Sequence, residues 1–377
     1  MDKITFFPLG NADTTLIVLK NGKIILWDYA STKTSEEGDK RCDLPTELNK
    51  RVKGDFDVVC FTHADEDHIK KMSEYFYLEH AEKYQGENRK KIIELWVPAA
   101  ILVDTENKND DDAILKAEAR YRLKNGAGIK VFSKPDKLKD WLKKNEIDFE
   151  KIEHLIIDAG TNIPGWDKLA DGIEFFVHSP FVGHINECDV VDRNDAGIIA
   201  QAIFGNRAET KFILGADAHA DVWENIVKIT KYHGNEDKLA WDIFHLPHHC
   251  SYKSLNGLEK GENKTVPTSE TKWLFETKGN SDCLIVSPSD EIVFSDTIQP
   301  PHFQAYNYYK NDVTDKKNGV ITVTMQHPSK SNPLPLVVEI NDDGFSIEKE
   351  GLTEEEKIAG AKVIASKSIV TGNYCSN

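Results

Sequence analysis

The sequence predicts a globular α/β protein, on three observations. Short apolar runs bounded by turn residues alternate with segments of helical periodicity along most of the 377 residues. Several of these runs end in loops that carry histidine and aspartate, and residues 61–68 form the densest such loop. Hydrophobic residues make up 40% of the chain, enough to bury a large core as one big domain or two modest ones. No internal repeat or low-complexity linker divides the sequence, which favours one elaborated domain.

Composition limits the partners and the compartment that we expect. The 47 basic and 63 acidic residues leave a net charge of −16, so any contact with nucleic acid must use a local basic patch or bound metal ions. Six cysteines are scattered without a C-x-x-C pair, which suits a reducing compartment. The N-terminus lacks a signal-peptide pattern, and no apolar run approaches the length of a membrane span. We therefore expect a cytoplasmic protein that makes no membrane contact.

The loop THADEDH at 62–68 is the strongest candidate for a site. A strand that ends in a tight loop can turn His63 and Asp65 toward one point, while Asp67 and His68 reach a second point beside it. Imidazole and carboxylate are ligands for Zn²⁺, Mn²⁺ or Fe²⁺, so this pattern predicts a site for two metal ions. The alternative is a helix cap, in which Asp65 or a neighbouring hydroxyl accepts from backbone N–H groups.

Other elements follow from periodicity and turn residues. Asn-Gly at 21–22, between apolar runs, is a hairpin signal. After His68, apolar residues recur at helical spacing, so the loop is expected to open a helix. The expected strands are 4–9, 15–19, 23–27, 57–61, 92–97, 129–132, 154–157, 173–180, 210–217, 241–248, 283–287 and 318–323. The expected helices include 113–123, 136–144 and 220–230.

The spacing His-x-Asp-x-Asp-His at 63–68 resembles the HxHxDH signature of the metallo-β-lactamase superfamily, with aspartate in place of the second histidine. Within that superfamily it resembles the metallo-β-lactamase domain of ComEC, a DNA-uptake channel protein, and its free-standing relatives. The resemblance implies a four-layer αββα sandwich of metallo-β-lactamase type. It also implies two divalent metal ions, Zn²⁺ or Mn²⁺, at the edge between the two sheets.

The resemblance spans roughly residues 3–345. It implies a hydrolase domain over 1–350, with an inserted elaboration at about 104–160. Residues 351–377 are expected to form a C-terminal helix and tail, because Thr353 and Glu356 make a capping box.

Three further stretches carry the resemblance. Residues 8–17 and 24–28 are similar to the opening and the "iLID" strand of ComEC-type domains, which would place Asp13 and Asp28 near the metal site, at most behind the ligands. Both could equally be turn or strand-end residues. Residues 210–217 are similar to the family's "LLTGD" motif, so Asp217 is expected to bridge both ions. His219 either opens the following helix or adds a hydrogen bond behind the ligands.

Residues 241–254 resemble the family's "lkvpHHGSxxS" motif, with Cys250 where glycine is usual. His248 then aligns with the metal ligand. His249 is free to act as a proton donor or phosphate contact. The cysteine adds a side chain where the backbone would approach substrate.

The resemblance leaves some positions open. His302 could contact the leaving group, or could be a helix-capping or core histidine. The ligand from the third family motif could be His178, His184 or Asn194. The full set of expected metal ligands is His63, Asp65, Asp67, His68, Asp217 and His248, with Asp67, His249 and His302 as catalytic residues.

These motifs imply a metal-dependent hydrolase of phosphodiester bonds, foremost a nuclease acting on DNA, in which two ions activate a hydroxide. The chain offers no G-x-S-x-G elbow and no glycine-rich phosphate loop as an alternative. A small phosphoester or cyclic nucleotide is a second candidate substrate, which the net charge tolerates better. A third hypothesis is a metal-binding sensor or scaffold in a defence or DNA-processing complex, beside a partner protein encoded nearby.

Overall fold

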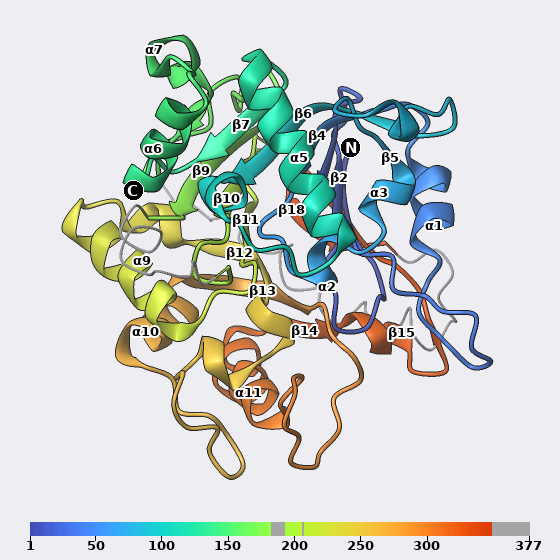
Figure 1. Ribbon diagram of the computed structural model, residues 1–377. Coiled ribbons are helices and arrows are strands. Elements are labelled where there is room, and N and C mark those ends of the chain that lie inside the picture. Colours follow the sequence, from blue (N-terminus) through green and yellow to red (C-terminus); the bar gives the residue numbers. More distant parts are fainter. Residues whose placement is uncertain (182–192, 206, 349–377) are drawn as a thin grey trace, which may run out of the picture.

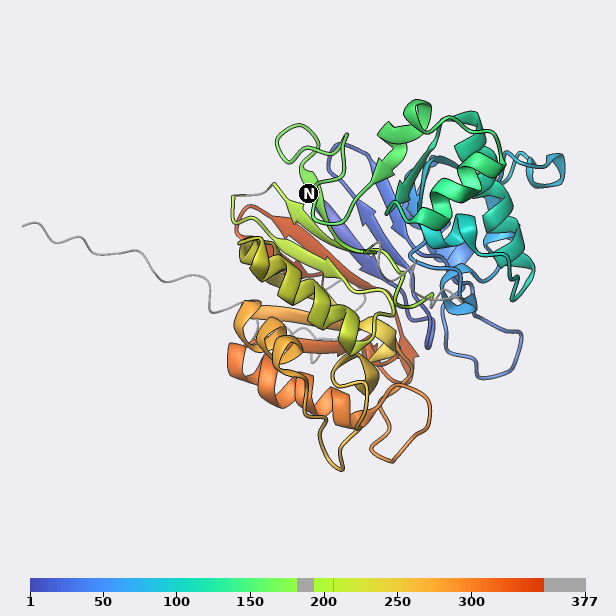
Figure 2. The same ribbon diagram turned by 60° about the vertical axis from the view of Figure 1, so that its left-hand side comes forward.

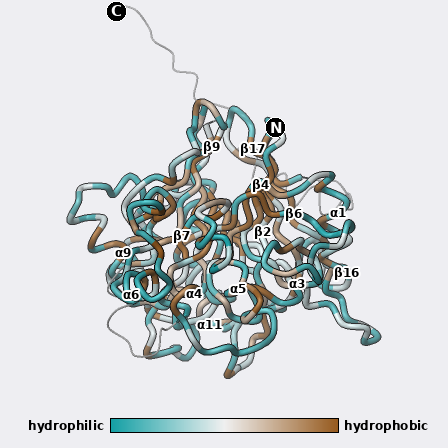
Figure 3. The backbone as a smooth tube through the Cα atoms, turned by 45° about the horizontal axis from the view of Figure 1, so that its top comes forward, coloured by the Kyte–Doolittle hydropathy of each residue, from teal (hydrophilic) through white to brown (hydrophobic). Residues whose placement is uncertain are grey.

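The computed structural model describes residues 1–181, 193–205 and 207–348, and in it two β-sheets pack face to face with helices on both outer sides (Figures 1 and 2). Buried apolar residues form three clusters, one between the sheets and one beneath each outer helical layer. Figure 3 shows the hydrophobic segments gathered in the interior of the molecule. The fold class expected from the sequence, a four-layer αββα sandwich, is confirmed.

The first sheet has the strand order β18-β17-β1-β2-β3-β4-β6-β7-β8, and β5 pairs with β6. It is antiparallel from β18 through β17, β1 and β2 to β3, and parallel from β3 to β8. Its strands are β1 (Asp2–Phe6), β2 (Thr15–Val18), β3 (Ile24–Trp27), β4 (Phe56–Cys60), β5 (Phe76–Tyr77), β6 (Lys90–Pro98), β7 (Ile129–Phe132), β8 (Ile156–Ile157), β17 (Leu336–Asn341) and β18 (Gly344–Ile347).

The second sheet has the order β14-β13-β12-β11-β10-β9, and β11 to β14 run parallel. Its strands are β9 (Ile173–Ser179), β10 (Ile199–Phe204), β11 (Lys211–Leu214), β12 (Trp241–His245), β13 (Gly279–Ser287) and β14 (Val320–Val323). Residues 318–323 were expected to form a hairpin strand, and this is wrong, because β14 joins β13 in parallel. A separate small hairpin pairs β15 (Pro328–Ser329) with β16 (Asn332–Pro333).

Helices cover the outer face of each sheet. Against the first sheet lie α1 (Leu44–Arg51), α3 (Met72–Tyr75), α4 (Ala99–Val103), α5 (Asp110–Asn125), α6 (Asp136–Lys144) and α7 (Phe149–Ile152). Against the second lie α9 (Ala220–Tyr232), α10 (Ser269–Lys278) and α11 (Phe303–Tyr308). In the described ranges, no helix is both long and apolar enough to cross a membrane.

Most predicted elements appear at their expected positions. β7 and α6 have the expected bounds, and they belong to the segment expected as an elaboration, which adds β7 and β8 to the end of the first sheet. The helix expected after His68 is instead two short ones, α2 (Glu66–Ile69) and α3, because Lys71 between them adopts a left-handed conformation with φ of 60°. The C-terminal helix expected after residue 350 lies outside the described residues.

The parallel strands determine where a site can form. Because β3, β4 and β6 are parallel in one sheet, and β11, β12 and β13 in the other, the loops that follow them meet along one edge of the sandwich. The sequence motifs at 28, 61–68, 215–217 and 246–250 all follow such strands. The fold therefore brings together polar segments that are far apart in the sequence.

Candidate metal centre

Four buried side chains from four separate segments of the chain converge at this edge. Asp13 comes from the β1–β2 connection, His68 from α2, Asp217 from the loop after β11, and His249 from the turn after β12. One ligand-type atom of each lies within 4.8 Å of the others, and each residue is at most 3% exposed. We call these four residues the central cluster.

Both histidines of the central cluster are held with the same ring nitrogen facing inward. His68 Nδ1 lies 2.8 Å from Asp28 Oδ2, and His249 Nδ1 lies 2.8 Å from the carbonyl oxygen of Pro288. A carboxylate and a carbonyl can only accept, so each Nδ1 donates to its partner and each Nε2 faces the cluster, where it can bind a metal ion once its own proton is lost. A proton on the outer nitrogen and a lone pair on the inner one is the usual arrangement of metal-binding histidines.

The position of Asp28 is itself fixed by the loop at 62–68, the metal loop. Thr62 donates to it twice, from its backbone N–H to Oδ1 and from its hydroxyl to Oδ2, each at 2.7 Å. Asp28 adopts a left-handed backbone, with φ of 57°, directly after β3. The side chain therefore lies behind His68 and links β3 to the loop after β4, as the sequence resemblance implied.

In the part of the chain that the structure describes, the ionic partners of the site carboxylates Asp13, Asp28, Asp67 and Asp217 are all histidines. Across residues 1–181, 193–205 and 207–348, none of Asp13, Asp28, Asp67 and Asp217 forms an ion pair with lysine or arginine. Both carboxylate oxygens of Asp13 are buried without a hydrogen-bond partner, 3.5 Å from His68 Nε2 and 3.1 Å from His245 Nε2. Buried carboxylates without compensation are costly, so this site demands bound positive charge.

The pKa shifts of the two buried histidines and of Asp217 also indicate that this site requires bound positive charge. Burial lowers the pKa of His249, but the carboxylates of Asp217 and Asp67 raise it by more, to about 10. Burial also opposes the charged form of His68, yet Asp28 and Asp217 hold its pKa well above the ordinary value. Burial would raise the pKa of Asp217, but the two imidazoles hold it well below its usual range. Without a metal, protons on the imidazoles supply the positive charge that the carboxylates require.

A left-handed turn after β12 sets the positions of the paired histidines. The strand ends at His245, and His248, His249 and Cys250 have φ angles of 50°, 53° and 65°. Left-handed backbone costs any residue other than glycine, which explains why glycine suits position 250. Gly215 allows this turn to pack closely, since a Cβ there would lie 2.6 Å from the carbonyl oxygen of His245.

The paired histidines lie outside the strand that was expected to reach His248. β12 ends at His245, and a turn holds His248 and His249. The structure places His249, and not His248, in the central cluster. His248 instead uses its backbone N–H to donate to Asp217 Oδ1 at 3.1 Å, while its ring lies 5.2 Å from that of His219.

The expected ligands on the metal loop differ in how close they lie to the central cluster. Asp67 Oδ2 lies 3.0 Å from His249 Nε2, so it adjoins the cluster together with His68. His63 packs its ring 3.9 Å from that of His68, and its Nε2 is buried without a hydrogen-bond partner, which leaves it available to a ligand. Asp65 does not join the cluster, because its Oδ1 pairs with Lys108 at 2.8 Å.

The remaining candidates are not members of the central cluster. His302 precedes α11, and its ring contacts Tyr252 at 4.9 Å and the Ile298 carbonyl at 3.4 Å, which matches the core histidine left open by the sequence. His178 is buried on β9 and bonds to the Lys238 carbonyl, and burial lowers its pKa to about 4. His184 lies outside the described residues. Asn194, the third candidate from that motif, lies in the turn before β10, where its carbonyl accepts from Gly197.

Two residues lie closer to the site than the sequence indicates. Asp13 was expected behind the ligands at most, but it is a member of the central cluster, and His245 lies beside it, with Nε2 3.1 Å from Asp13 Oδ1. Asp13 is held there by its backbone N–H, which donates to the Asp67 carbonyl at 3.0 Å. The available signals were an aspartate after a glycine turn and a histidine at the last position of an apolar strand. Neither is specific without the tertiary contact.

Comparisons with known proteins give fold-level similarity only. No protein-family model matches the chain, and no curated protein matches it. Similar solved structures include the metallo-β-lactamase fold protein YhfI from Bacillus subtilis, with 9% identity, a TM-score of 0.43, and coverage of 89% of this chain and 99% of that one. An isothiocyanate hydrolase from Delia radicum gut bacteria has 13% identity, a TM-score of 0.37, and coverage of 88% and 98%. A diphosphatase from the PhnP family has 12% identity, a TM-score of 0.31, and coverage of 77% and 87%.

Because these similarities are low, the fold assignment depends on the sheet topology, and the assignment of the site depends on its own geometry. Together they define an αββα protein with a buried His/Asp centre at the edge where its two sheets meet.

Proposed function

We propose that this chain is a metal-dependent hydrolase of metallo-β-lactamase type that cleaves phosphodiester bonds, with DNA as its substrate. The observation that carries the proposal is the central cluster, in which two histidines present Nε2 beside carboxylates that no lysine or arginine neutralises in the described ranges. Asp13, His68, Asp217 and His249 would hold the first divalent ion. His63 and Asp65, together with Asp67, would be the candidates to hold a second ion.

The residues fit a divalent ion by their chemistry. Two imidazole nitrogens and carboxylate oxygens form a donor set suited to Zn²⁺ or Mn²⁺. A divalent ion bound there supplies a water of lowered pKa and a Lewis acid for a phosphoryl oxygen. The protein itself contributes orientation: Asp28 and the Pro288 carbonyl fix the two imidazoles, and the backbone of His248 fixes Asp217.

The phosphodiester assignment depends on the sequence motifs at 63–68, 210–217 and 241–254, which resemble those of ComEC-type domains. Asp67 is the candidate for positioning the attacking water, since it lies at the more open side of the cluster, with its side chain 35% exposed. The net charge of −16 favours the second candidate, a small phosphoester or cyclic nucleotide.

Hydrolysis assays with Mn²⁺, Zn²⁺ and Mg²⁺ test this proposal. The substrates are single- and double-stranded DNA, a chromogenic phosphodiester and cyclic nucleotides, and Asp217→Asn is the inactive control. Cleavage of DNA, with binding that weakens as salt rises, supports the nuclease. Cleavage of small substrates alone supports the second candidate. Full metal content without any hydrolysis would instead support a sensor or scaffold that acts beside another subunit.

A further inference from the structure

Asp65 differs from the other aspartates of the site in its charged surroundings. Its Oδ1 lies 2.8 Å from Lys108 Nζ and 3.4 Å from Arg193 Nη1. The other aspartates of the site are Asp13, Asp28, Asp67 and Asp217. In the part of the chain that the structure describes, they have only histidines as ionic partners. The two halves of the expected binuclear site therefore differ in local charge.

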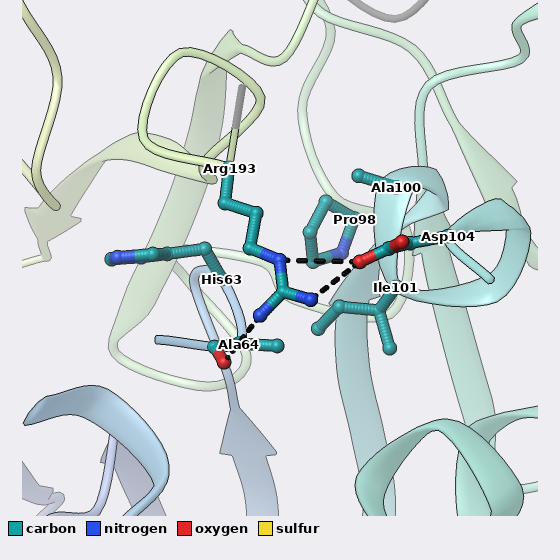
Figure 4. Close-up of a pocket in the computed structure, with 7 residues that line it drawn as sticks. All are labelled: His63, Ala64, Pro98, Ala100, Ile101, Asp104 and Arg193. Atoms are coloured by element: carbon teal, nitrogen blue, oxygen red, sulfur yellow. Dashed lines mark hydrogen bonds and ion pairs between the residues drawn. The ribbon is translucent and has the colours of Figure 1, made fainter. Parts of the chain in front are cut away.

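Arg193 is built into the fold behind the metal loop. It is 8% exposed, and its guanidinium donates to the carbonyl of Ala64 at 3.0 Å and to Asp104 Oδ2 at 2.6 Å. It also donates to Asp112 Oδ2 at 2.8 Å. Figure 4 shows Arg193 between the loop at Ala64 and Asp104, in a small cavity that His63 also lines. The guanidinium is thus fixed close to the predicted ligands His63 and Asp65.

Lys108 reaches the same carboxylate from the segment between α4 and α5. Its side chain is 54% exposed, and its backbone N–H donates to Asp112 Oδ2, the oxygen that Arg193 also contacts. The inserted segment thus supplies a second positive charge at Asp65. Both cations contact Oδ1, which leaves Oδ2 as the oxygen through which Asp65 would bind an ion.

We propose that Lys108 and Arg193 make the two metal positions unequal, so that one ion binds tightly at the central cluster and a second binds weakly beside His63 and Asp65. A positive charge beside the ligand carboxylate repels an incoming cation and offsets the negative charge that would attract it. The ammonium of Lys108 and the guanidinium of Arg193 are therefore positioning groups that set the affinity for the second ion. This inference rests on the proposed metal site, but not on the substrate.

Calorimetric titration of the metal-free full-length protein with Mn²⁺ alone tests this difference. We expect two binding steps, the second at least about tenfold weaker than the first, as a charge contact at a partly exposed site implies. Lys108→Met should strengthen the second step by roughly threefold to tenfold and leave the first unchanged. Asp65→Asn should remove the second step and keep the first.

The matched control is Lys70→Met, which removes a lysine of the same loop region that pairs with Glu66 and not with Asp65. It should change neither step. Two equal steps in the wild-type protein, or a second step that Lys108→Met leaves unchanged, would overturn the inference while the metal site stands. Absence of any Mn²⁺ binding would overturn the metal site itself, and the inference with it.

Discussion

The imidazole of His68 donates from Nδ1 to the carboxylate of Asp28 across 2.8 Å, and this pair links the end of β3 to the loop after β4. The carboxylate fixes which ring nitrogen faces the cluster and makes that nitrogen a better donor to a cation. Asp28 thus acts on a bound ion through His68, without being a ligand.

Asp28→Asn tests this relationship. The asparagine keeps an oxygen for Thr62, but it loses the negative charge opposite His68. We expect the affinity for the first metal ion to fall by roughly tenfold to a hundredfold, the usual effect of losing such a partner. Chelator competition measures the affinity, and a circular dichroism spectrum checks the fold. Unchanged affinity would mean that Asp28 has only a structural role.

The paired histidines give a second prediction. Because His249 belongs to the central cluster and His248 does not, His249→Ala should abolish tight metal binding, whereas His248→Ala should keep it. Elemental analysis of both purified variants measures this directly. The opposite result would support the assignment made from the sequence motif, in which His248 is the ligand.

Asp13 provides a third prediction. Its two oxygens are buried without hydrogen-bond partners, so Asp13→Asn should lower metal content and raise the thermal stability of the metal-free protein, because a buried negative charge is removed. Differential scanning calorimetry with and without Zn²⁺ gives both quantities. A variant that binds metal like the wild type would return Asp13 to the role of a turn residue.

Proton release gives a fourth prediction. With its pKa raised to about 10, His249 carries a proton on both ring nitrogens in the metal-free protein at pH 7.5, and the raised pKa of His68 favours the same doubly protonated form. Metal binding should release about one proton from His249 and add to this any proton that His68 loses, and the affinity should increase as pH rises. Titrations in HEPES and Tris, whose heats of ionisation differ, count the protons. Binding enthalpies that agree in both buffers would contradict this expectation.

The same pKa shift predicts an opposite trend for the metal-free fold. A histidine whose pKa is raised on folding stabilises the protein fully below its ordinary pKa of about 6.5, and that contribution is lost as pH rises through about 10. Denaturant unfolding of the metal-free protein should therefore become easier between these two pH values. The His249→Gln variant is the control, because it should lose most of this dependence.

The sequence predicted the fold well because strands such as β7 and loops such as 61–68 are encoded by local patterns. The order of apolar runs and turn residues along the chain is compatible with few layer architectures, and the four-layer sandwich is one of them. The site was harder to predict, because its ligands depend on contacts between distant segments. The left-handed turn at His248 and His249 has no local signal, since glycine is absent from 248–250. Asp13 enters the cluster through a backbone bond to Asp67, which no spacing rule encodes.

The central cluster takes Asp13 and His68 from loops of the first sheet, and Asp217 and His249 from loops of the second. An ion held by all four would act as a cross-link that closes the long stretch of chain between His68 and Asp217. Such a closure restricts the unfolded chain and clamps the two sheets at one edge. Removal of the metal should therefore increase amide hydrogen exchange well beyond the site itself, at strands β1 and β12, where the rings of Phe6 and His245 stack across the two sheets.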